Sequence, residues 1–274
     1  MPDTMEWRGT TDGDFAKAAN WIDSATGVAP ASSPANGDTI KFNKGNVDVD
    51  AGLTTSRTGM IIVGTSGYTG RIGPASPLSI ASASVRWLGC GSLNITGNIT
   101  AGRIRCRTGS SFTYAGGTAT SLYIERTDYS IAAAAVVTTA RTYQSFGSDL
   151  NNGTGFTLFD CVGGMHTSRR AGKFVMSAQS KLKAKIGCDL TAGTQIVGRS
   201  KVEYLSQEDI AADVTVYPDG YFDGSGSDGF AWSGTLNRWP GASINLDSGG
   251  GAVVPSTINT YGIGDNVGDA IPVP

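Results

Sequence analysis

Short segments in which apolar and polar residues alternate recur along most of the chain and predict β-strands. The clearest is 181–186, in which Leu182, Ala184 and Ile186 share one face and three lysines share the other. The same two-residue period recurs at Leu93/Ile95, Ile104/Cys106, Phe112/Tyr114, Leu122/Ile124, Phe174/Met176, Val202/Tyr204, Val214/Val216 and Ile244/Leu246. Half-buried strands, and hence an all-β fold, follow from this pattern.

The turns between these segments favour a β-solenoid. Successive segments begin roughly eight to twelve residues apart, a spacing shared by sandwiches, barrels and solenoids. Two features favour stacked coils: residues 91–97 loosely resemble residues 187–193, and single Gly, Asn or Asp residues divide the segments. We therefore expect a right-handed parallel β-helix with coils of roughly 20–25 residues. A jelly-roll or similar β-sandwich stays open as the alternative.

Two stretches depart from the alternating pattern. Residues 131–143 begin with an alanine run that suits a short helix, but their β-branched second half favours a strand. Residues 248–274 are rich in Gly and Pro and have no periodic apolar face, which predicts an extended arm held by a neighbouring chain. The predicted organisation is an N-terminal cap of aromatic and turn residues at 1–45, an all-β body at 46–247 and a C-terminal arm at 248–274.

The opening of the chain contains an ordered set of aromatic and turn residues: Trp7-Arg8-Gly9, Asn20-Trp21, Pro34 and Gly37-Asp38-Thr39-Ile40-Lys41-Phe42. This order resembles the opening of bacteriophage virion β-solenoid proteins and of autotransporter-like passenger proteins, although Phe15 stands where Trp is usual. The resemblance implies a repetitive β architecture and a structural opening segment without catalytic residues. We expect the rings to form a packed hydrophobic end of the fold; the other interpretation is an aromatic platform for a ligand.

Composition and charge narrow the classes of partner. Of 274 residues 16% are charged and the formal net charge is −2, so bulk electrostatics favours neither nucleic acid nor an acidic membrane surface. The first six residues show neither the basic region nor the apolar run of a secretory signal. The longest apolar run, 131–137, is far shorter than the ~18 residues of a membrane span. Nucleic-acid and membrane partners are therefore not expected.

Metal-ligating residues are scattered. One histidine, His166, accompanies four single cysteines at Cys90, Cys106, Cys161 and Cys188, which predicts buried free thiols rather than a zinc site. Residues 219–229, with Asp219, Asp223 and Asp228, faintly resemble a calcium loop. Counting from Asp223, however, Asp228 and Gly234 occupy the places where an EF-hand needs Gly and Glu. A solvated turn is the expected structure there.

Groups for acid–base or nucleophilic catalysis are equally sparse. Acidic residues that could pair for glycoside hydrolysis are Asp160, Asp189, Glu203, Asp213 and Asp223, but a sequence does not give their separation. A serine hydrolase would need His166 as its base, and Gly224-Ser225-Gly226 is typical of a flexible turn rather than a nucleophile elbow. The prediction is no catalytic, metal-binding or cofactor-binding residue.

Two basic strips remain: Arg103, Arg105 and Arg107, and the series Arg169, Arg170, Lys173, Lys181, Lys183 and Lys185. They suit either docking on an acidic protein surface or contact with phosphate. The other interpretation is the solvent face of strands, where charge guards against edge pairing.

These observations predict a non-enzymatic structural protein of a bacteriophage virion, made in the host cytoplasm. We expect a capsid decoration or accessory surface protein that forms a homo-oligomer, with a trimer as one candidate, and contacts other virion proteins such as the major capsid protein. One alternative is a tail fibre or spike that binds or cleaves host glycan through a groove lined by Tyr221, Phe222, Trp232 and Trp239. A bacterial surface adhesin is a second alternative, and the expected lack of an export signal counts against it.

Overall fold

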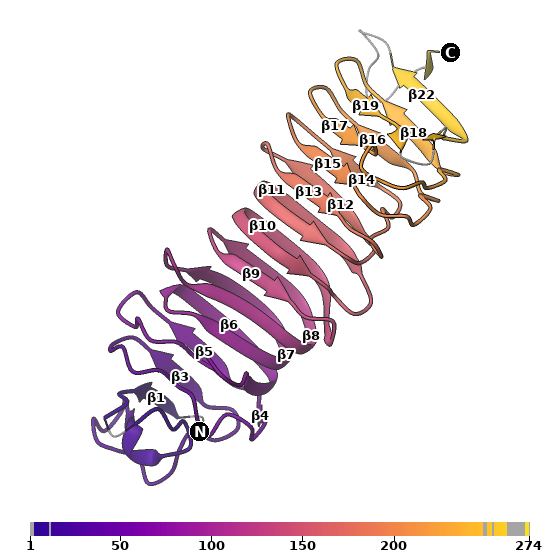
Figure 1. Cartoon of the computed structure of the whole chain (residues 1–274). Helices are drawn as coiled ribbons and strands as arrows, with labels where there is room; N and C mark the ends of the chain where they lie inside the picture. The colour runs from indigo at the N-terminus through magenta and orange to yellow at the C-terminus, as the bar shows by residue number, and fades with distance from the viewer. Residues whose placement is uncertain (1–2, 11, 249–250, 254, 262–271, 274) are drawn as a thin grey trace. The chain divides into compact units, whose positions relative to one another are not determined.

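The chain folds into β-strands that stack as parallel coils, a β-solenoid (Figure 1). The computed structural model describes residues 3–10, 12–248, 251–253, 255–261 and 272–273. Within these ranges the helical structure is one 3₁₀ turn, η1 (Ala18–Asn20). The all-β solenoid is thus confirmed over the jelly-roll alternative. The chain forms two compact units, Met1–Thr139 and Ala140–Pro274, whose boundary falls within β10 (Ala135–Leu150).

The first unit is a parallel ladder. In register, β1 pairs with β3, β3 with β5, and the series continues through β6, β7, β8 and β9. Ile40, Ile62 and Val85 thereby occupy one inward column on successive coils. The strands are β1 (Thr4–Trp7), β2 (Trp21–Asp23), β3 (Thr39–Phe42), β4 (Arg57–Thr58), β5 (Ile61–Gly64), β6 (Leu78–Cys90), β7 (Leu93–Cys106), β8 (Ser111–Glu125) and β9 (Asp128–Ile131).

Aromatic rings fill the beginning of this unit. The ring centroid of Phe42 lies 5.2–6.1 Å from those of Trp7, Trp21, Tyr68 and Trp87, mostly in edge-to-face or tilted contacts. All five rings are buried, and the buried Asn20 amide donates hydrogen bonds to the turn that precedes it. The predicted packed hydrophobic end is confirmed, and an exposed aromatic platform is not formed by these rings. Because β1 and β3 are themselves coils of the ladder, this end is continuous with the solenoid.

The second unit carries two parallel ladders. One runs from the second half of β11 through β13, β15, β17 and β19, and the other from β12 through β14, β16, β18 and β22. The strands are β11 (Phe156–Ser168), β12 (Gly172–Ser177), β13 (Lys181–Ala184), β14 (Thr194–Ile196), β15 (Lys201–Tyr204), β16 (Val214–Val216), β17 (Tyr221–Asp223), β18 (Thr235–Arg238), β19 (Ser243–Asn245), β20 (Asp247–Ser248), β21 (Gly251–Ala252), β22 (Thr257–Tyr261) and β23 (Pro272–Val273).

Coil length varies along the chain. Leu182 pairs with Val202 and Val202 with Phe222, so a coil takes 20 residues there. The spacing falls to 15 residues between Phe159 and Phe174. It rises to 23 residues between Ile62 and Val85 in the first unit. The coils are therefore on average somewhat shorter than predicted, since the sheets stay in register while the corner turns differ in length.

The alternating pattern identified the core with one error at 181–186. Leu182 and Ala184 are buried as predicted, but the prediction for Ile186 is wrong, because β13 ends at Ala184 and Ile186 stands in the following turn with 64% of its surface exposed. The other predicted pairs are buried except Ile244/Leu246, which is half-buried. Residues 131–143 contribute to strands β9 and β10 instead of a helix.

The prediction for 248–274 is wrong where the structure describes the segment. Thr257–Tyr261 form β22, which pairs in parallel with β18 of the same chain. The register rests on polar and aromatic ladders, because the Asn259 amide donates to Asn237 (2.9 Å) and the Tyr261 ring stacks on Trp239 at 4.8 Å. Residues 249–250, 254, 262–271 and 274 of the expected arm lie outside the described residues.

Candidate functional site

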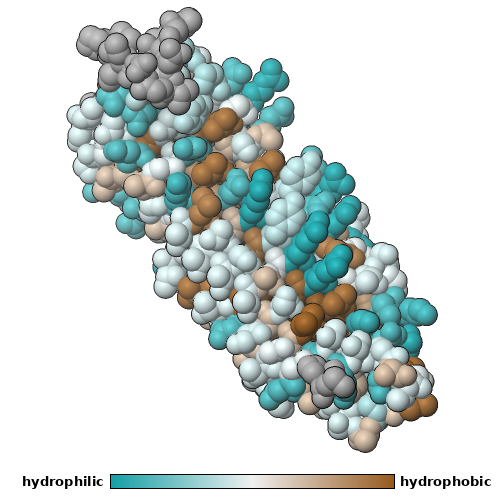
Figure 2. Space-filling view, turned by 180° about the vertical axis from the view of Figure 1, so that it is seen from behind, coloured by the Kyte–Doolittle hydropathy of each residue, from teal (hydrophilic) through white to brown (hydrophobic). Residues whose placement is uncertain are grey.

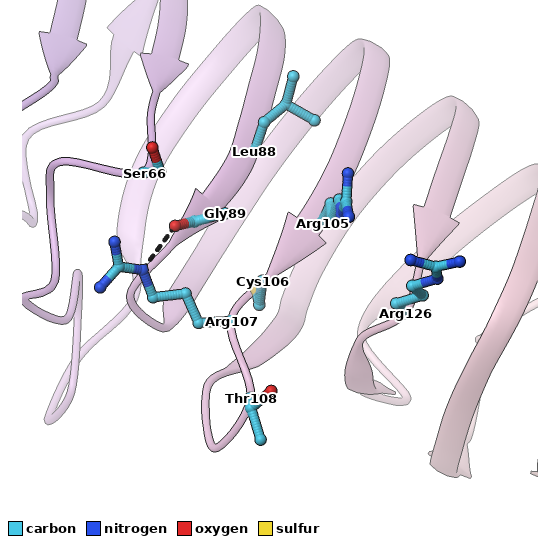
Figure 3. A pocket seen from close by; sticks show the side chains of 8 residues that line it. All are labelled: Ser66, Leu88, Gly89, Arg105, Cys106, Arg107, Thr108 and Arg126. Atoms are coloured by element: carbon cyan, nitrogen blue, oxygen red, sulfur yellow. Dashed lines mark hydrogen bonds between the residues drawn. The ribbon is translucent and has the colours of Figure 1, made fainter.

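The largest hollow in the described surface lies in the first unit and is lined by three arginines. It has a volume of about 780 Å³ and opens to solvent. Its lining comes from four successive coils: Ser66 after β5, Leu88 and Gly89 on β6, residues 105–108 at the end of β7, and Arg126 after β8. Figure 3 shows the Arg105, Arg107 and Arg126 side chains on different sides of this space, with Cys106 between them. We call it the arginine hollow.

Local backbone geometry sets the directions of these side chains. Gly89 has a φ of +67°, in the left-handed region that favours glycine, and the β6–β7 register shifts between Leu88 and Cys90. The Gly89 carbonyl accepts a 2.7 Å hydrogen bond from Arg107 Nε, the contact dashed in Figure 3. Arg126 also has a left-handed φ, +46°. The bulge and the two left-handed residues thus surround the hollow.

The guanidinium groups are held over a neutral floor. Arg105 Nε lies 3.8 Å from the Glu125 carboxylate, and its side chain is 46% exposed. Burial raises the pKa of the Cys106 thiol to about 12, which leaves the thiol protonated at neutral pH. The hollow therefore presents fixed positive charge without a nucleophile, an arrangement that suits binding of an anion rather than covalent chemistry.

The predicted acidic candidates do not meet at one site; most of them make structural contacts. Asp160 forms an ion pair with Arg141 at 3.2 Å, and Asp223 forms one with Lys201 at 3.0 Å. Asp213 accepts the Thr235 backbone N–H at 2.8 Å. Asp189 is half-buried and desolvation raises its pKa. Glu203 faces Lys183 at 3.8 Å. Among the described residues no group of three or more His, Cys, Asp or Glu side chains could hold a metal ion.

His166 lies in the core of the second unit. Its Nε2 is 3.3 Å from Thr142 Oγ1, and its ring meets the Phe159 ring edge-on at 5.4 Å. Burial lowers the His166 pKa to about 4, so the imidazole is neutral at pH 7. Ser225, the serine of the glycine-flanked turn, donates to Asp223 at 2.7 Å instead. The arrangement is that of a packed core histidine.

The aromatic residues predicted for a glycan groove are separated. Phe222 and Trp232 are buried against each other at 5.2 Å. Lys201 lies over the half-buried Tyr221 ring at 4.8 Å. Trp239 is stacked between Tyr217 and Tyr261, so its faces are occupied by neighbouring rings. These four residues do not line a common groove.

The second basic strip is dispersed over paired positions. Arg169 contacts Asp149 at 3.1 Å and Arg170 contacts the Asn151 side chain at 3.0 Å. Lys181 is exposed, and Lys183 and Lys185 are half-buried. This strip is a solvent face with ion pairs between coils. Of the two strips, the one at 103–107 belongs to a hollow.

The remaining surface is mixed in character. On the face that Figure 2 shows, hydrophobic residues form several small groups among hydrophilic ones. The exposed large hydrophobic residues are Val28, Ile61, Phe146, Met165, Ile186 and Ile258. No helix in the described ranges is both long and apolar enough to span a bilayer. Comparison of the chain with protein-family models, with curated proteins and with solved structures found no match.

Proposed function

We propose that this chain is a non-enzymatic structural protein of a bacteriophage virion, a decoration or accessory protein of the capsid surface. The observation that carries the proposal is the opening segment. Its Trp7, Trp21 and Phe42 rings close one end of a parallel β-solenoid, and the order of its residues resembles that of phage virion solenoid proteins.

The contacts of the charged side chains support a scaffold role. Ion pairs join neighbouring coils at Arg141–Asp160, Arg169–Asp149, Lys183–Glu203 and Lys201–Asp223. Side chains that catalysis would use are thereby engaged in holding coils together. A protein of this kind serves by presenting a stable surface, and we propose that it assembles as a homo-oligomer in contact with other virion proteins.

The test is a census of purified virions. Particles isolated on a density gradient from the source host are analysed by mass spectrometry and cryo-electron microscopy. We expect this chain in a fixed copy number, with solenoid density on the capsid surface. Density on a tail fibre or spike instead would favour the glycan-binding alternative and overturn the capsid assignment. Recovery of the chain in the soluble lysate fraction, with none in the particles, would overturn the virion proposal as a whole.

A further inference from the structure

The arginine hollow stands in a basic surface that contrasts with the chain as a whole. Between residues 86 and 128 the sequence has five arginines but one glutamate and one aspartate, although the whole chain has a net charge of −2. The five arginines are Arg86, Arg103, Arg105, Arg107 and Arg126, and three of them line the hollow. Positive charge is thus concentrated at this part of the first unit.

The pairing of two of these arginines is unfavourable in the free protein. Arg86 and Arg103 are direct partners on β6 and β7, and like charges opposite each other destabilise a sheet. The next partner of Arg86 is Val63, and that of Arg103 is Tyr123, whose ring lies 5.6 Å below its guanidinium carbon. In the described part of the chain, Arg86, Arg103 and Arg107 form no ion pair.

The second unit handles its cations differently. Arg141, Arg169 and Lys183 each face an acid on a neighbouring coil. Even where Lys181 lies beside Lys201, the Lys201 ammonium bonds Asp223 at 3.0 Å. The basic surface around the hollow therefore lacks the acidic partners found elsewhere in this fold, which is the charge arrangement of a site completed by an external anion.

The geometry of the hollow indicates what that anion is. A guanidinium matches the paired oxygens of phosphate, sulfate or carboxylate groups. Arg105 and Arg126 come from adjacent coils, whose strands are spaced at about 4.8 Å, so two anionic groups about 5 Å apart can engage both. Arg107 is oriented by its bond to Gly89, and hydroxyl groups of Ser66 and Thr108 lie on the rim. The volume of about 780 Å³ is that of a small-molecule site.

From these observations we infer that the arginine hollow binds a small ligand that carries two or more neighbouring anionic groups. The inference does not depend on the virion proposal, because it rests on the contacts and charges of the first unit. Phosphate, sulfate and carboxylate groups share the required chemistry, and the probes below distinguish them.

The test is isothermal titration calorimetry of the full chain at 150 mM NaCl with tripolyphosphate, citrate and inorganic sulfate. We expect tripolyphosphate or citrate to bind at least tenfold more tightly than sulfate, and the tighter of the two identifies the anionic group. Arg105→Gln and Arg126→Gln should each weaken that binding at least tenfold. Arg105→Lys should restore part of it, since lysine keeps the charge but loses the fork. Arg169→Gln, at an exposed arginine of the second unit, is the matched control and should change binding less than twofold.

Folding is checked by thermal unfolding, which should be unchanged in these variants because the substituted side chains are exposed. The inference is overturned if both polyanions bind with Kd above about 10 mM, or if Arg169→Gln weakens binding as much as Arg105→Gln. It is also overturned if a single-stranded oligonucleotide binds more tightly than either polyanion and competes with it, because the surface would then recognise a polymer backbone.

Discussion

Protonation of His166 should make the stability of the second unit depend on pH. The imidazole is fully buried, and burial lowers its pKa from 6.5 to about 4 in the folded state. The unfolded chain therefore binds a proton below pH 6.5 while the folded chain resists it. Stability from this group is fully present above pH 6.5 and is lost as the pH falls toward 4.

The magnitude follows from the size of the pKa difference. One pKa unit corresponds to about 1.4 kcal/mol, so the full loss between the two limits is about 3.4 kcal/mol. At pH 5 the unfolded histidine is nearly all protonated and the folded one about one-tenth protonated, which gives a loss of about 2 kcal/mol. This is a substantial fraction of the stability of a typical domain.

The assay compares urea unfolding at pH 7.5 and pH 5.0, followed by circular dichroism, in the parent and in His166→Gln. Glutamine retains a polar group near Thr142 Oγ1 but does not titrate, so other titrating groups cancel in the comparison. The parent should lose about 2 kcal/mol more than the variant between the two pH values. Thr142→Val, which keeps the histidine, should retain the pH dependence. A parent–variant difference that is the same at both pH values would refute the reasoning.

Three further substitutions test the packing. Phe42→Ala removes the ring at the centre of the aromatic end and should lower the free energy of unfolding by about 3–5 kcal/mol in urea titrations; a loss below about 1 kcal/mol would contradict the close packing. Gly97→Ala places a Cβ 1.5 Å from a carbonyl oxygen of the neighbouring coil and should prevent stable folding, whereas Gly109→Ala, also at positive φ but in open space, should cost only about 1 kcal/mol; equal thermal midpoints would refute the close approach. Leu182→Asp buries an unpaired charge and should cost several kcal/mol, about 3 or more, while Lys181→Asp at the exposed neighbour should leave the thermal midpoint nearly unchanged; similar shifts would mean that the strand register is wrong.

The sequence predicted the strands and their inward faces better than their ends. Alternation at Leu182 and Ala184 is a direct consequence of the pleat, so those burial predictions are confirmed. Ile186 continued the same pattern in the sequence but stands in a turn, because alternation does not show where a corner begins. Tyr261 was missed as part of a strand, since its segment is held by side-chain ladders along the stack and not by an apolar face.

The candidate site was only partly visible in the sequence. The alternation of Arg103, Arg105 and Arg107 marked one basic strip, but Arg126 joins it from the next coil and is not adjacent in the chain. A coil length of about 20 residues, applied to the strip, would have pointed to that position. Choosing between a parallel solenoid and an antiparallel sandwich was beyond the alternation itself, because both have a period of two.

The short spacing between paired strands bears on how the protein is made. Each coil finds its partner only 15–23 residues earlier in the chain. A ribosome that adds about 5–20 residues per second therefore delivers a new coil every one to four seconds or so. The preceding coil is already available as a template when each new one emerges. Synthesis can thus proceed as sequential growth from the aromatic end, without a long unpaired strand waiting for a distant partner.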